Sequence, residues 1–149
     1  MEVQEAMRAD SKTEAAVIEV VNRYAEAFAS RDVDATLAFL APDPDVTFIG
    51  TGGDEKRIGL AEIRSLLERD FAQFDDASVE ISSPAVSAAG SAAWVVADLT
   101  LRAKTRGREI YLQARFTVVL ERRGDEWFIV QGHASLPAAG QEEGEAFPA

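Results

Sequence analysis

The chain contains no cysteine and a single histidine, His133. Without cysteine it has no disulfide bonds, no thiolate nucleophile and no zinc or iron–sulfur site built on cysteine. One histidine cannot form a metal centre of histidine ligands, and it gives little support to a histidine-based triad. We therefore expect no metal and no cofactor, and the lack of cysteine fits a reducing, cytoplasmic location.

Basic residues are also few, with 15 Lys and Arg against 26 Asp and Glu, so the formal net charge is −11. This charge repels phosphate backbones and anionic lipid, and we expect neither nucleic acid nor a membrane as a partner. Long apolar runs are absent as well, because the uncharged stretch between Glu80 and Asp98 is interrupted by Pro84 and Gly90. The length of 149 residues suits one domain.

Helical spacing of apolar residues is confined to the first half of the chain. A capping-box spacing begins at Ser11, and Asp32 is suited to cap a second, short helix. The predicted helices cover about residues 12–29, 33–40 and 60–74, and between the last two lie a strand at 46–50 and a polar loop at 51–57.

From residue 78 onward the apolar period is mainly two, which predicts an antiparallel meander. Helices followed by strands favour an α+β fold, with helices packed on one face of a curved sheet, over an alternating βαβ fold. The predicted strands cover 78–81 or beyond, 91–104, 108–122 and 126–136. The expected organisation is a mobile segment at 1–11, a domain at 12–137 and an acidic, mobile tail at 138–149.

Two hairpin turns decide which side chains face the helices. A three-residue loop at 105–107 would place Asp98 opposite Ala114. A three-residue loop at 123–125 would place Ala114 opposite Ala134, although a two-residue Gly-Asp loop stays open. Because a one-residue slip moves every side chain to the other face, patterning favours this register. It predicts an apolar face of Ile110, Leu112, Phe116, Val118, Leu120, Phe128, Val130 and Leu136, and an outer face of Gln113, Arg115, Thr117, Gln131, His133 and Ser135.

This register brings an ionisable residue, Asp98, to the apolar face. Its small neighbours Ala114 and Ala134 leave space beside the carboxylate, as in a ligand pocket, and a buried carboxylate can act as a general acid or base. The alternative is an inert cavity in which Asp98 bonds a tyrosine hydroxyl, such as that of Tyr24. The predicted pocket residues are Tyr24, Phe28, Phe48, Trp94, Asp98, Leu112, Ala114, Phe116, Val118 and Ala134.

Two short motifs have plain explanations. The glycine-rich residues 50–55 carry Glu55 where a dinucleotide loop needs its third glycine, so a flexible rim to a pocket is the simpler interpretation. Residues 123–125 spell Arg-Gly-Asp, an adhesion tripeptide, but a polar turn between strands explains them.

Three segments carry a resemblance to a known family. They are Tyr24-Ala-Glu-Ala-Phe followed by Arg-Asp at the end of the first helix, the strand Val-Thr-Phe-Ile-Gly-Thr at 46–51, and residues 116–137. The last segment contains Trp-Phe-Ile-Val-Gln-Gly-His-Ala-Ser, which is similar to the pattern W-x-I-V-H-x-H-x-S with Gln131 in place of the first histidine. Over about residues 12–137 the chain resembles the SnoaL-like domains of the nuclear-transport-factor-2-like superfamily.

The resemblance implies a cone-shaped roll with a cavity between sheet and helices, and a homodimer formed through the outer sheet face. Members include polyketide cyclases, steroid isomerases and epoxide hydrolases, in which a cavity aspartate is the acid or base, and non-catalytic association domains of calcium/calmodulin-dependent protein kinases. In this chain, the resemblance assigns the role of that cavity aspartate to Asp98. The expected dimer face contains Val95, Ala97, Leu99, Leu101, Arg115, Gln131 and His133.

These expectations leave three functions open. The first is binding of a small apolar or carbonyl-containing molecule, with Asp98 as its polar anchor. The second is a cofactor-independent isomerase or cyclase in which Asp98 moves a proton beside a carbonyl. The third is a non-catalytic module for homo-oligomerisation.

Overall fold

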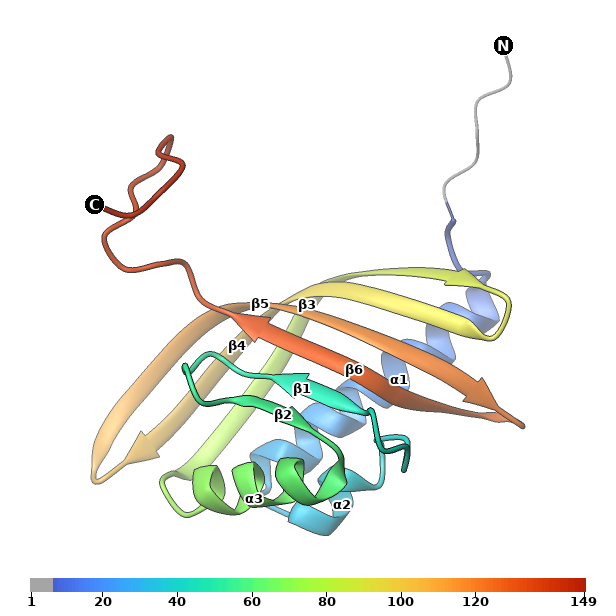
Figure 1. Cartoon of the computed structure of the whole chain (residues 1–149), viewed down its shortest axis with the longest axis horizontal. Helices are drawn as coiled ribbons and strands as arrows, with labels where there is room; N and C mark the ends of the chain where they lie inside the picture. Colours follow the sequence, from blue (N-terminus) through green and yellow to red (C-terminus); the bar gives the residue numbers. More distant parts are fainter. Residues whose placement is uncertain (1–6) are drawn as a thin grey trace.

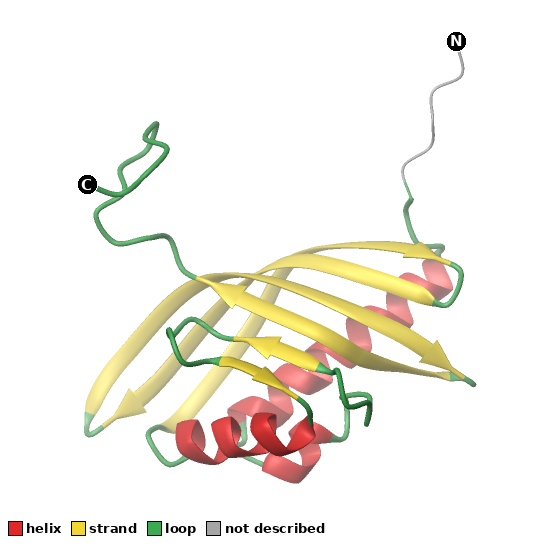
Figure 2. Ribbon diagram, in the orientation of Figure 1, coloured by secondary structure: helices red, strands yellow, loops and turns green. Residues whose placement is uncertain are grey.

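Three helices pack against the concave side of one curved, six-stranded sheet in the computed structural model, which describes residues 7–149 (Figures 1 and 2). The predicted α+β fold is confirmed. The helices are α1 (Ser11–Ala29), α2 (Val33–Leu37) and α3 (Leu60–Phe71). The strands are β1 (Thr47–Ile49), β2 (Lys56–Ile58), β3 (Asp75–Ala89), β4 (Ala92–Thr105), β5 (Arg108–Arg123) and β6 (Glu126–Ser135).

The strand order is β2-β1-β6-β5-β4-β3. The β1 strand runs parallel to β6, and every other pair is antiparallel. The long helix α1 crosses behind the sheet and packs mainly on β3, and α2 and α3 lie below the sheet (Figure 1). The β1–β2 hairpin continues the sheet beside β6. Because the long strands curve toward the helices, the sheet and helices enclose a space between them.

The helix starts follow from side-chain caps. The Asp10 carboxylate accepts a bond from the Thr13 backbone N–H at 2.8 Å, so the cap of α1 lies one residue before the predicted Ser11. Asp32 caps α2 as predicted, accepting from the Ala35 N–H at 3.0 Å. The predicted polar loop at 51–57 is wrong at its end, because Lys56–Ile58 pairs with β1 as an edge strand.

The β4–β5 register differs from the predicted one by one residue. The turn contains only Arg106 and Gly107, both with positive φ (50° and 77°), which is the backbone that a two-residue hairpin turn requires. Asp98 therefore lies opposite Arg115 rather than Ala114. The predicted register is wrong for β4, and the inward and outward faces of that strand are exchanged.

The β5–β6 hairpin closes with the two-residue Gly-Asp turn that the sequence left open, pairing Arg123 with Glu126. An irregularity beside Val130 then shifts the register by one residue. Trp127 and Ile129 are buried before this shift, so the predicted inward placement of Phe128 and Val130 is wrong. After the shift the predicted inward residue Ala134 does lie on the inner face, but opposite Phe116.

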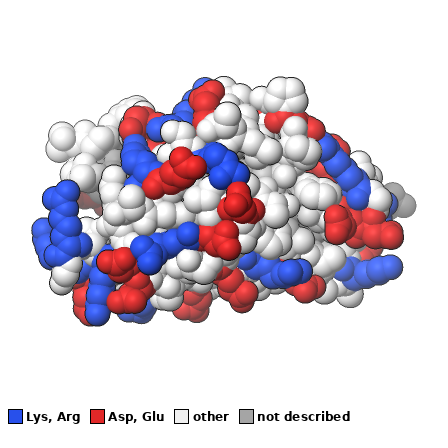
Figure 3. Space-filling model, turned by 90° about the horizontal axis from the view of Figure 1, so that it is seen from below, with Lys and Arg blue, Asp and Glu red and all other residues white. Residues whose placement is uncertain are grey.

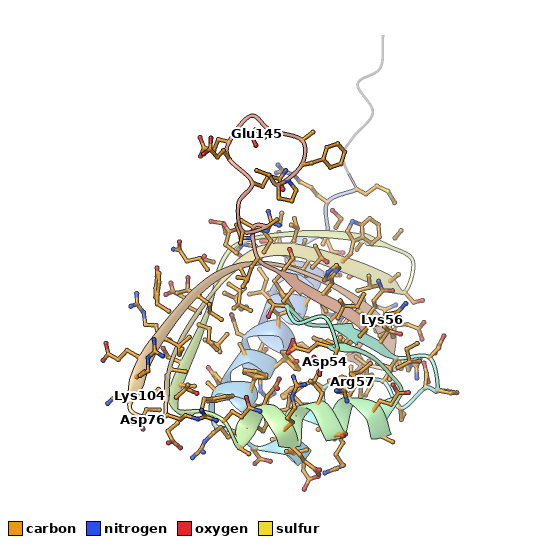
Figure 4. The ribbon with its side chains drawn as sticks, turned by 60° about the vertical axis from the view of Figure 1, so that its left-hand side comes forward. Asp54, Lys56, Arg57, Asp76, Lys104 and Glu145 are labelled. Atoms are coloured by element: carbon orange, nitrogen blue, oxygen red, sulfur yellow. The ribbon has the colours of Figure 1, made fainter. Side chains whose placement is uncertain are left out.

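The two ends of the domain differ in their contacts. Residues 1–6 of the predicted mobile segment lie outside the described residues, whereas the Ala9 N–H donates to the Val86 carbonyl and the Ala88 N–H to that of Met7. The predicted tail at 138–149 projects from the sheet beyond β6, with Glu145 at its far turn (Figure 4). Within residues 7–149, no helix is both long and apolar enough to cross a bilayer.

Candidate functional site

A cavity of about 410 Å³ lies between the concave face of the sheet and the helices. Its volume falls within the range of small-molecule sites, about 300 to 1,000 Å³. The walls are mainly apolar, and the charged side chains gather on one side, formed by the β1–β2 loop and the end of α3. Apolar wall residues from four strands are Val79, Ile81, Leu99, Leu101, Leu112, Ala114, Phe116 and Ala134.

Aromatic rings from α1, β1 and the segment after α3 also line the cavity. The Tyr24 ring stacks on Phe48 with centroids 5.6 Å apart. Phe28 contacts Phe71 edge-on at 5.1 Å and stacks on Phe74 at 5.8 Å. These contacts hold the rings against one another, so the cavity is lined by rings whose orientation is set by packing.

The Tyr24 hydroxyl has no hydrogen-bond partner among residues 7–149, although the ring is packed into the wall. Burial raises the pKa of Tyr24 above its ordinary value of 10.0, so the phenol is neutral at physiological pH. A neutral phenol can both donate and accept a hydrogen bond. Tyr24 therefore offers an unused polar group to whatever occupies the cavity.

Three carboxylates share one guanidinium at the polar side of the cavity. Arg69 Nη1 lies 2.6 Å from Asp54 Oδ2, and Arg69 Nη2 lies 3.2 Å from Glu55 Oε1 and 3.0 Å from Asp70 Oδ1. Arg69 Nε also donates to Asp70 Oδ1 at 3.1 Å. We call these four residues, Asp54, Glu55, Arg69 and Asp70, the mouth cluster. Glu55, Arg69 and Asp70 line the cavity.

The glycine-rich loop holds Glu55 in place. The Gly52 N–H donates to Glu55 Oε2 at 2.6 Å, and the Gly50 N–H donates to the Glu55 carbonyl at 3.1 Å. A Cβ atom at Gly52 would lie 2.7 Å from Glu55 Oε2, so the close approach of this loop to the carboxylate requires glycine. The segment predicted as a pocket rim does border the cavity, at Gly50, Thr51 and Glu55.

Asp70 is the mouth-cluster acid whose pKa is raised above its ordinary value. Burial is the main cause, and the charges of Glu55 and Asp54 act in the same direction, while Arg69 opposes them. Of the two Asp70 carboxylate oxygens, Arg69 donates only to Oδ1, and Oδ2 has no partner within the described chain. Asp70 thus presents a partly desolvated carboxylate oxygen that is free to accept a bond.

The predicted pocket residues are only partly brought together. Asp98 and Trp94 lie on the exposed, outer face of the sheet, so their predicted placement in the pocket is wrong, and Val118 belongs to the core. The cause is the two-residue turn at Arg106, which exchanges the faces of β4. The predicted pocket residues that do line the cavity are Tyr24, Phe28, Phe48, Leu112, Ala114, Phe116 and Ala134.

The same exchange changes the predicted dimer face. Val95 and Ala97 are buried in the core, and Leu99 and Leu101 line the cavity, so none of the four lies on the outer face. The predicted outer residues Arg115, Gln131 and His133 are exposed there. Trp94 and Val96 take the outer positions of β4, with 37% and 53% of their surface exposed.

Sequence reasoning missed the acids of the mouth cluster. Asp70 follows Ile63 by seven residues and Leu66 by four, which is the spacing that places it on the buried stripe of α3. That spacing is the signal that could have identified Asp70.

Within the described chain, no group of three or more histidine, aspartate or glutamate side chains is arranged to hold a metal ion.

Comparisons with solved structures agree with this fold. An NTF2-like superfamily protein from Salmonella enterica has 23% identity and a TM-score of 0.82, covering 93% of this chain and all (100%) of its own. A protein from Novosphingobium aromaticivorans, named only as a candidate aromatic ring hydroxylase, has 21% identity and a TM-score of 0.79, covering 87% of this chain and 94% of its own.

A further protein from Streptomyces avermitilis, named as a candidate dehydratase of the NTF2-like family, has 18% identity and a TM-score of 0.78, covering 88% of this chain and 100% of its own. These likenesses show a shared fold. No curated protein matches the chain in sequence. The family model for the SnoaL-like domain matches residues 17–139, and the chain therefore belongs to the SnoaL-like domain family.

Proposed function

We propose that this domain binds a small molecule with an apolar body in its cavity. The observation that carries the proposal is the 410 Å³ cavity, walled by aliphatic and aromatic side chains, with Tyr24 among its lining residues. Pockets with apolar walls and a few polar groups are typical of small-molecule sites. Tyr24 and Asp70 Oδ2 are the groups that would orient the ligand.

A fluorescence titration with N-phenyl-1-naphthylamine, an uncharged dye that brightens in apolar surroundings, tests this proposal. We expect saturable binding that Ala114→Leu weakens, because Ala114 faces the cavity. The matched control is Gln113→Leu, at the neighbouring, outward-facing position of β5. No saturable binding, or equal loss in both variants with both folded, would contradict the proposal.

A second candidate function is proton transfer to or from the bound molecule, with Asp70 as the acid or base in place of Asp98. The favouring observation is the partly buried Asp70 carboxylate, with its raised pKa, on the cavity wall. Turnover of a bound carbonyl compound that Asp70→Asn abolishes, with dye binding retained, would support it. Unchanged turnover in that variant would exclude this role of Asp70.

We also propose that the domain forms a homodimer through the outer face of the sheet. The exposed apolar residues Trp94 and Val96 lie there on β4, beside Thr117 and Val119 of β5. Light scattering during size-exclusion chromatography should report a dimer, and Val96→Asp should shift it to the monomer. A monomeric wild-type protein at micromolar concentration would rule the dimer out.

A further inference from the structure

We infer that the ligand of this cavity carries a positive charge, such as a protonated amine, at the end that meets the mouth cluster. The inference rests on the proposed function and names the chemical class of its ligand. Three features of the cavity support the inference: the charges of the mouth cluster, the hydrogen-bonding atoms without a partner and the aromatic walls.

The charges at the mouth do not balance. Asp54, Glu55 and Asp70 carry three negative charges against the one positive charge of Arg69, and each nitrogen of that guanidinium already bonds a carboxylate. The Arg57 side chain is directed to backbone carbonyls, including that of Asp54, and it does not line the cavity (Figure 4). An anion entering the cavity would meet two carboxylates and no uncommitted cation.

The carboxylates that line the cavity are partly shielded from water. The side chains of Glu55 and Asp70 are 14% and 25% exposed, against 70% for Asp54. Charges interact more strongly where water is partly excluded. On the face seen from below, by contrast, acidic and basic side chains are interspersed (Figure 3). The acidic excess at the mouth therefore acts on a ligand inside the cavity.

The remaining lining also suits an organic cation. Asp70 Oδ2 and the Tyr24 hydroxyl both lack a partner in the described chain, and both can accept a hydrogen bond from an ammonium group. The faces of aromatic rings attract cations as well. A ligand with a flat or aliphatic body and an ammonium group beside Asp70 would match both the apolar walls and the carboxylates of the cavity.

Three ligands of one shape test the charge preference: 2-(1-naphthyl)ethylammonium, 2-(1-naphthyl)ethanol and 1-naphthylacetate, each displacing N-phenyl-1-naphthylamine. We expect the ammonium to bind roughly fivefold to tenfold more tightly than the alcohol, in line with about 1 kcal/mol for a charge pair near a surface. The acetate should bind most weakly. Asp70→Asn and Glu55→Gln should each lower the ratio of ammonium affinity to alcohol affinity.

Asp98→Asn is the matched control, because it removes the same charge from the outer face of the sheet. An equal effect of Asp98→Asn and Asp70→Asn would attribute the preference to the net charge of the protein and overturn the inference. Equal affinity for the ammonium and the alcohol, or tighter binding of the acetate, would also overturn it. If the dye itself does not bind, the proposed function fails; if it binds without a charge preference, only the cation inference fails.

Discussion

The Phe48 ring occupies the space that a side chain at residue 132 would fill. Gly132 is the cross-strand partner of Phe48 between β6 and β1, and a Cβ atom on it would lie 2.3 Å from Phe48 Cζ. Phe48 in turn supports Tyr24 by stacking. One glycine in β6 therefore sets the position of the aromatic wall of the cavity.

Gly132→Ala should destabilise the domain and distort this wall. The added methyl group forces the Phe48 ring away, and overpacking of this kind costs about 1 to 3 kcal/mol. Urea denaturation measures the loss. Phe48→Leu, which removes ring atoms, should make the same alanine substitution less harmful in the double variant. Additive effects of the two substitutions would show that the close contact is not the cause.

Tyr24→Phe should leave the stability of the free protein nearly unchanged, because the hydroxyl has no partner within the described residues. Binding of a ligand that bonds this hydroxyl should weaken by roughly tenfold, the worth of about one hydrogen bond. Thermal unfolding and dye displacement by 2-(1-naphthyl)ethanol give the two readouts. A large loss of stability without a change in affinity would assign the hydroxyl a structural role.

Asp70 should make the protein less stable as pH rises. Because burial raises the pKa of Asp70 above 3.8 in the folded state, the folded protein binds this proton more tightly than the unfolded chain does. The stabilisation is complete below about pH 3.8 and is lost as pH increases through the raised pKa. Asp70→Asn should therefore gain stability relative to wild type over that window, and keep the gain at neutral pH.

Urea denaturation of wild type and Asp70→Asn between pH 3 and 7 checks this sign, since the other acids titrate alike in both proteins. The expectation would be contradicted if Asp70→Asn were less stable than wild type at pH 7 and the difference in stability became smaller as the pH was lowered. That result would mean that the bonds from Arg69 outweigh the burial of the carboxylate.

Neighbouring valines on β4 should respond oppositely to a charge. Val95 is 2% exposed in the core, so Val95→Asp would bury an unpaired carboxylate and should cost several kcal/mol, about 3 or more. Val96 is 53% exposed, and Val96→Asp should change monomer stability little. Urea denaturation of both variants tests the register directly, because the register predicted from the sequence would reverse the two results.

Local patterns in the sequence were sufficient to predict most of the helices and strands. The spacing of apolar residues predicted the three helices, the alternation in β5 predicted its inner face, and the segment from Phe116 to Pro137 led to the SnoaL-like family. These features depend on residues close together in the chain, where a helix or a half-buried strand has its own periodicity.

The placement of the site residues depends on information that the spacing of apolar residues does not contain. The segment from Trp94 to Ala97 is apolar on both faces, so alternation cannot orient β4, and the inward face depends on the positive φ of Arg106 in a two-residue turn. Asp98 consequently lies outside the cavity rather than within it.

By itself, the sequence determined the fold class and the apolar faces of α1, α3 and β5, because these follow from local periodicity, and its motifs carried the resemblance to the family. Only the tertiary structure decided which carboxylates meet the cavity. Glu55 and Asp70 belong to separate elements and come together at Arg69 because the β1–β2 loop and α3 pack side by side at one end of the sheet. Contacts between segments that pack in this way leave no periodic signal along the chain.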